Sequence, residues 1–213
     1  MVAVIPVGVE RSYWIGSKQR IVQTQRGILM KRQLQVQLKD ISGKMKDMDY
    51  KKFYNLEEYL FREVGPLFRE SSTLSVEDFF CIVIWKANRA KTNIKKKLSK
   101  TTTLSESIRQ IISDLVKAKE PEEKLDILVK KWKFGLPMAT AILTVLYPKE
   151  FTVYDYRVRE QLGLSNIYSV KKYFKDFLPM VKKYADSRNE SLRESDKELW
   201  GKSFFGDLQK LIK

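Results

Sequence analysis

The carboxylate of Asp155 stands in the stretch of this chain best suited to chemistry. It follows a short turn at Gly135, an apolar run from Met138 to Tyr147 and a break at Pro148. The first amides of a helix have no partner within the helix and can hold a phosphate. A fixed carboxylate can stabilise developing positive charge or deprotonate water. This order of elements is typical of a module that holds a nucleic-acid backbone and places one carboxylate beside it.

The turn before the apolar run carries further candidate ligand-binding residues. Gly135 is expected to take the positive φ that a tight helix–helix turn needs, and Pro137 suits the first turn of a helix, where its missing N–H costs least. Arg157 follows the carboxylate and is either a phosphate contact or a solvated side chain. The candidate backbone-binding residues are therefore Lys131, Lys133, Phe134, Gly135, Leu136, Met138, Ala139 and Arg157.

A second group of candidate residues follows an apolar run that ends at Trp85. At helical spacing Trp85, Asn88 and Arg89 share a face, with Lys86 beside them. Such a face could stack on a base and bond its edge. The alternative is that Trp85 belongs to the core while Lys86 and Arg89 favour a helix C-terminus. Asp155 has a structural alternative as well, because aspartate is a preferred helix N-cap.

Composition narrows the partners and the chemistry. The 213 residues include 41 Lys and Arg against 26 Asp and Glu, a net charge of +15. A polyphosphate partner accounts for this excess most simply, with an anionic membrane surface or solubility as alternatives. With no histidine and one cysteine, the chain has no Cys/His zinc site, no iron–sulfur cluster, no disulfide within the chain and no Ser-His-Asp catalysis. We expect no metal and no cofactor.

No apolar stretch reaches the length that spans a bilayer, and the apolar part of the N-terminus is too short for a good signal peptide. An intracellular protein, in the cytoplasm or nucleoid, is therefore expected.

The elements that must position these residues are helices. The first is expected to stop at Gly65-Pro66, and Asp155 is expected to cap a helix that ends near Gly163. One helix covers about 137–147, and residues 187–196 are expected to be a loop. Further helix starts are indicated at Asn55, Ser75, Thr103, Pro121, Ser169 and Ser195. These signals predict an all-α fold, a compact orthogonal bundle over 51–213, preceded by an N-terminal extension over 1–50 of uncertain structure.

The residues around the turn resemble a known family. FGLPMATAIL, then a proline, then FTVYDYRV is similar to the helix–hairpin–helix element and trailing aspartate of the HhH-GPD superfamily of base-excision DNA glycosylases. The family's hairpin resembles LPGVGRKTA. With its last glycine on Gly135 and its alanine on Ala139, the family's lysine falls on Pro137. Asp155 lies eighteen residues beyond Pro137, which is the spacing of the family's aspartate. The motif covers about 120–165.

The resemblance implies a hydrolase that releases a modified or damaged base flipped from double-stranded DNA, for repair or for defence against modified phage DNA. Asp155 would be the catalytic carboxylate, the hairpin would bind DNA, and Tyr154 would join Trp85 and its neighbours in the base pocket. A monomer is expected.

Two departures from the family pattern keep alternatives open. Lys133 replaces the first glycine of the hairpin, and Pro137 replaces the lysine that forms a Schiff base in bifunctional members. The resemblance therefore implies a monofunctional enzyme that leaves an abasic site. The alternatives are a DNA-binding protein without catalysis, or a glycosylase with lyase activity through another lysine such as Lys86.

Overall fold

A computed structural model describes residues 49–212, and every regular element in that range is a helix, which confirms the all-α prediction. Residues Lys51–Lys213 form one compact unit. The predicted N-terminal extension falls almost entirely on residues outside the described range and stays a prediction. None of the described helices is both long and apolar enough to cross a bilayer.

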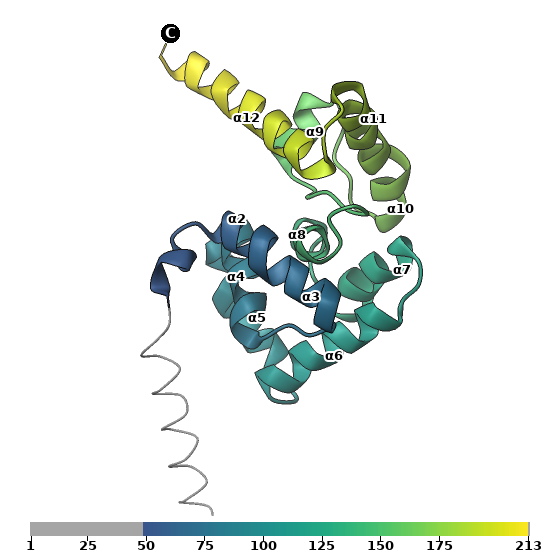
Figure 1. The fold of residues 1–213 in the computed structure, drawn as a ribbon. Helices are drawn as coiled ribbons and strands as arrows, with labels where there is room; N and C mark the ends of the chain where they lie inside the picture. Colours follow the sequence, from purple (N-terminus) through teal and green to yellow (C-terminus); the bar gives the residue numbers. More distant parts are fainter. Residues whose placement is uncertain (1–48, 213) are drawn as a thin grey trace, which may run out of the picture. The chain divides into compact units, whose positions relative to one another are not determined.

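The elements run in the following order along the chain (Figure 1): η1 Tyr50–Phe53, α2 Leu56–Tyr59, η2 Leu60–Val64, α3 Gly65–Ser71, α4 Val76–Ala87, η3 Asn88–Ala90, α5 Lys91–Leu98, α6 Leu104–Lys117, α7 Pro121–Asp126, η4 Ile127–Lys131, α8 Leu136–Leu146, α9 Tyr156–Gln161, α10 Val170–Lys172, η5 Tyr173–Phe177, α11 Leu178–Arg188 and α12 Leu192–Leu211. The turns η2, η4 and η5 are π-type and continue directly from the α-helices before them.

Helix α8 is the centre of this unit. All of its residues except Pro137 are buried, and α3, α4 and α7 pack around it. Figure 1 looks along α8, while α3 and α6 lie across the view. The packing of α3 on α8 needs a glycine, because a Cβ on Gly65 would meet the Val145 carbonyl oxygen at 2.6 Å. Because α8 is packed on several sides, the segment that leaves it toward Asp155 starts from a fixed position.

Local capping explains where most helices begin. Asn55, Ser75 and Thr103 each accept a hydrogen bond from the backbone N–H three residues later, as the sequence predicted. Ser169 caps α10 in the same way. Pro121 occupies the first turn of α7.

Two predicted helix boundaries are wrong. The first helix does not stop at Gly65-Pro66, because the chain continues through the π-type turn η2 into α3, and Pro66 lies at the junction. A π-type turn or a proline is a usual place for a helix to bend rather than end.

The last helix begins at Leu192 and is capped by Ser191, whose hydroxyl accepts the Glu194 N–H. Ser195, the predicted cap, is buried one turn inside the helix. The predicted loop over 187–196 is correspondingly shorter. Helix α12 packs on α9 and α11, and its C-terminal half projects past them in Figure 1.

Candidate functional site

The turn between η4 and α8 has a different backbone from the one expected. Gly135 has φ −65° and is the N-cap of α8, whereas Lys133 has φ +54°. The prediction of a positive φ at Gly135 is therefore wrong. The left-handed position falls two residues earlier, where the hairpin alignment places a glycine. The Lys97 Nζ donates to the Lys133 carbonyl oxygen at 2.6 Å, and this contact holds a conformation that lysine seldom adopts.

Most of the hairpin residues chosen from the sequence have buried side chains. Phe134, Leu136, Met138 and Ala139 belong to the hydrophobic core. Their side chains anchor the turn, so only their main chain is available to a ligand. Gly135 is exposed at the start of α8, where the first N–H groups of a helix lack intrahelical acceptors.

The lysines of the hairpin differ in their partners. Lys131 pairs with Asp114 at 2.7 Å. Lys133 is exposed and has no ion pair among the described residues. Burial, followed by the charge of Lys133, lowers the pKa of Lys97, whose Nζ also lies 4.6 Å from the centre of the Phe134 ring. Lys97 and Lys133 are therefore neighbouring cations, and neither has an ion pair within the part of the chain that the structure describes.

A buried segment carries the chain from α8 to Asp155. The Tyr154 N–H donates to the Thr140 hydroxyl at 2.9 Å, and the Thr152 main chain bonds the Tyr173 hydroxyl on both its N–H and its carbonyl. Tyr154, which the sequence placed in a base pocket, is itself buried, and its hydroxyl accepts the Ile167 N–H at 2.8 Å. These bonds fix the backbone immediately before Asp155.

Asp155 has a partner on each carboxylate oxygen. Oδ1 accepts the Arg157 N–H at 3.0 Å, which makes Asp155 the N-cap of α9, and Oδ2 accepts the Lys86 Nζ at 2.6 Å. The Lys86 and Asp155 side chains are 15% and 17% exposed. The cap predicted from the sequence is confirmed. The same carboxylate also faces a cation from α4, a distant part of the chain.

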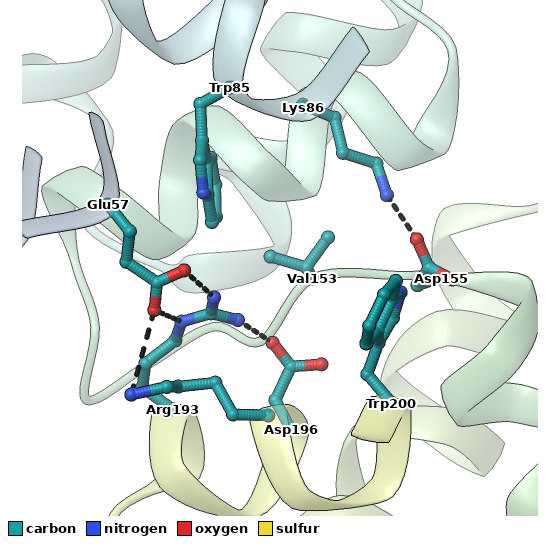
Figure 2. A pocket seen from close by; sticks show the side chains of 9 residues that line it. Glu57, Trp85, Lys86, Val153, Asp155, Arg193, Asp196 and Trp200 are labelled. Atoms are coloured by element: carbon teal, nitrogen blue, oxygen red, sulfur yellow. Dashed lines mark hydrogen bonds and ion pairs between the residues drawn. The ribbon is translucent and has the colours of Figure 1, made fainter. Parts of the chain in front are cut away.

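This ion pair lies at the edge of a cavity of about 470 Å³ (Figure 2). The cavity is lined by Glu57, Trp85, Lys86, Val153, Asp155, Arg193, Asp196, Lys197 and Trp200. A second cavity of about 410 Å³ is lined by hairpin residues, among them Leu136 and Pro137, and also by Lys86 and Asp155. The Lys86–Asp155 pair is therefore accessible from the side of the hairpin and from the side of the tryptophans.

Helix α12 supplies polar groups of the larger cavity that the sequence did not suggest. Arg193 donates to both oxygens of Glu57, at 3.2 and 2.7 Å, and through Nη1 to Asp196 Oδ2. Its guanidinium lies 5.1 Å from the centre of the Trp85 ring. Burial raises the pKa of Asp196 to about 6, although Arg193 opposes the shift. The contact with Arg193 favours the ionised form of this deeply buried carboxylate and so offsets part of the effect of burial.

Arg157 has an internal role rather than a free phosphate-facing guanidinium. Its Nη1 donates to Asp207 at 2.6 Å, and its guanidinium lies 5.2 to 5.6 Å from the ring centres of Tyr156, Trp200 and Phe204. Its side chain is 15% exposed. Arg157 thus joins α9 to α12 and supports Trp200 at the cavity wall.

The predicted face of Trp85, Asn88 and Arg89 is not formed. Helix α4 ends at Ala87, which leaves the helical conformation with φ −160°. Trp85 and Lys86 line the cavity, whereas Asn88 and Arg89 are exposed on η3 and line neither cavity. Asn88 accepts the Lys91 Nζ instead. A break in the backbone after Ala87 is the reason the i, i+3 and i, i+4 pattern fails here.

The residues on α12 share a readable pattern once the helix start is known. Arg193, Asp196 and Trp200 are spaced by three and four residues and so lie on one helical face. The wrong start at Ser195 hid this spacing. Within the described residues no group of His, Cys, Asp and Glu side chains could hold a metal ion.

Comparisons with protein-family models, with curated proteins and with solved structures found no match for this chain.

Proposed function

We propose that this protein is a DNA glycosylase that hydrolyses the N-glycosidic bond of a modified or damaged base flipped out of double-stranded DNA, and that it leaves an abasic site. Asp155 is the catalytic carboxylate. The resemblance of the hairpin motivates the choice of family, and the placement of Asp155 beside a cavity of about 470 Å³ that Trp85 and Trp200 line is the single observation that carries the proposal.

The chemistry follows from the environment of Asp155. As the C1′–N bond breaks, its electron pair leaves with the base and positive charge develops on the sugar. The carboxylate stabilises that charge and accepts a proton from the water that attacks C1′. Its orientation is set in advance by the Arg157 N–H and by Lys86. A fixed group of this kind lowers a barrier by about 3 to 4 kcal/mol.

The base and the backbone have separate places in this proposal. Trp85 and Trp200 give the larger cavity aromatic surfaces for a flipped base. The exposed start of α8 and the Lys97–Lys133 pair give the hairpin positive charge for phosphates. Asp155 lines both the tryptophan cavity and the cavity beside Leu136 and Pro137 at the start of α8, which fits a strand held at the hairpin with one nucleotide turned toward the tryptophans.

The direct test is mass spectrometry of bases released from varied genomic and phage DNAs. Asp155→Asn should lower release about 100- to 1,000-fold. Asparagine caps a helix as well as aspartate does, so the fold is kept while the charge is lost. The matched control is Asp186→Asn on the exposed face of α11, which should release bases at the wild-type rate. Undiminished release by Asp155→Asn would reject the catalytic role.

A second candidate function is favoured by the 2.6 Å contact of the Lys86 Nζ with Asp155. An amine at this place could attack C1′ of an abasic site, lose water to form a Schiff base and allow elimination of the 3′ phosphate. Borohydride reduction on abasic DNA would then link protein and DNA covalently, and Lys86→Met would abolish the adduct. The monofunctional proposal expects no adduct.

A third outcome would support a binding protein without catalysis. Tight, salt-sensitive DNA binding with no base released from any substrate would fit the hairpin and reject the enzyme.

A further inference from the structure

Asp196 presents one unused carboxylate oxygen to the larger cavity. Its side chain is 3% exposed, and Oδ2 accepts from Arg193. Oδ1 has no hydrogen-bond partner among the described residues, and Figure 2 shows it turned away from Arg193, toward Trp200. This oxygen belongs to a side chain that is almost wholly buried and is reached from the cavity, so a ligand there could supply the donor that the described residues do not.

The surroundings of Asp196 suit a planar heterocycle. Trp85 descends from α4 and Trp200 rises from α12, with Val153 between them (Figure 2). The charge of Asp155 contributes to the raised pKa of Asp196, so the two carboxylates lie close together. A base stacked against the tryptophans would have its sugar bond near Asp155 and its far edge near Asp196.

The charge pattern decides which base edge fits. An ionised carboxylate accepts hydrogen bonds and donates none. It pairs with an amino group, as acidic side chains do with N4 of cytosine, and repels a carbonyl oxygen. The cationic donors that line the cavity, Arg193, Lys86 and Lys197, each already contact a carboxylate. The cavity therefore offers acceptance rather than donation at this edge.

We propose that Asp196 determines substrate specificity by selecting bases whose edge carries an amino group, namely derivatives of cytosine or adenine, over bases with a carbonyl at that position. The role in catalysis rests on the proposed glycosylase function, but the recognition itself does not require hydrolysis.

The test measures binding of free nucleosides to the full chain by quenching of tryptophan fluorescence. Cytidine against uridine and adenosine against inosine are near-isosteric pairs that exchange an amino group for a carbonyl. Wild type should bind the amino member about tenfold more tightly in each pair, which corresponds to the discrimination of one good base contact.

Two substitutions test whether Asp196 sets the preference. In Asp196→Asn the amide oxygen can still accept from Arg193 while its NH₂ faces the cavity, so the preference should be lost or reversed toward uridine and inosine. The control Asp186→Asn, on the exposed face of α11, should keep the wild-type preference. A melting curve checks that Asp196→Asn folds, and the wild-type preference alone suffices if it does not.

The outcomes are distinct from those of the proposed function. Equal affinity within both pairs, or no saturable quenching by any of the four nucleosides, would overturn the role of Asp196. A clear amino preference in a protein that releases no base from DNA would reject the glycosylase and leave the recognition standing.

Discussion

Two carboxylate–cation pairs line the same cavity. They differ in how deeply the carboxylate is buried and in how many of its oxygens have a hydrogen-bond partner. Asp155 is 17% exposed, with one oxygen on Lys86 and the other on a backbone N–H. Asp196 is 3% exposed, with one oxygen on Arg193 and the other without a hydrogen-bond partner among residues 49–212. The first pair orients the Asp155 carboxylate at the start of α9. The second keeps a buried charge tolerable, which suggests that its presence serves recognition rather than stability.

The largest difference expected between the pairs is in folding stability when the cation is removed. Arg193→Leu leaves Asp196 buried without its partner and should lower the free energy of unfolding by about 3 kcal/mol. Lys86→Leu should cost only about 1 kcal/mol, because Asp155 keeps the Arg157 N–H and some solvent. Urea denaturation of the two variants would measure this, and equal losses would contradict the comparison.

The pH dependence of stability should come from Asp196. Its pKa is about 6 in the folded protein and 3.8 in the unfolded chain, so the folded state holds the proton more tightly. This group's contribution to stability is therefore full below pH 4 and is lost as the pH rises from about 4 to about 6, on the order of 2 to 3 kcal/mol.

Asp196→Asn should remove this decrease in the free energy of unfolding. The measurement is the difference between wild-type and variant denaturation curves across pH 4 to 7. The charged groups that act on Asp196 are Arg193 beside it on α12, Lys86 from α4 and Asp155 before α9. Asp155→Asn should leave most of the fall in place. A difference curve that is flat over this range would show that Asp196 is not a buried acid.

The capping role of Asp155 predicts a smaller effect. Asp155→Ala should lower the free energy of unfolding by about 1 kcal/mol relative to Asp155→Asn, because alanine cannot accept the Arg157 N–H. Thermal or urea unfolding of the two variants provides the measurement. If both variants unfold alike, the cap contributes nothing beyond the charge.

Lys197 should have the smallest effect of the cavity cations. Its Nζ lies 3.8 Å from Glu57 and its side chain is 45% exposed. Lys197→Ala should change the free energy of unfolding by less than about 0.5 kcal/mol. A loss comparable to that of Arg193→Leu would mean that the cavity depends on all its charges together.

The sequence predicted what depends on neighbours along the chain. The caps at Ser75, Thr103 and Asp155 each involve a bond to an N–H two or three residues away, so residue type and spacing were enough. The apolar composition of α8 likewise predicted a buried helix. Where two local solutions compete, as between Lys133 and Gly135 for the left-handed position, residue preference chose the wrong one.

The remaining contacts of the site join residues that are far apart in the sequence, so the spacing of residues within one helix does not predict them. Glu57 and Arg193 are 136 positions apart, and Lys86 and Asp155 are 69 apart. Trp200 reaches the cavity because Arg157 joins α9 to α12. A start of α12 placed four residues late was enough to conceal that Arg193, Asp196 and Trp200 share a face.

One experiment can test whether Asp155 acts in catalysis and Asp196 in base selection. Single-turnover base release would be compared for wild type, Asp155→Asn and Asp196→Asn on a panel of DNAs that carry different modified bases. We predict that Asp155→Asn slows release of every base by a similar factor, whereas Asp196→Asn changes the order in which bases are preferred. If Asp155→Asn releases bases at the wild-type rate, the central claim that Asp155 is the catalytic carboxylate is wrong.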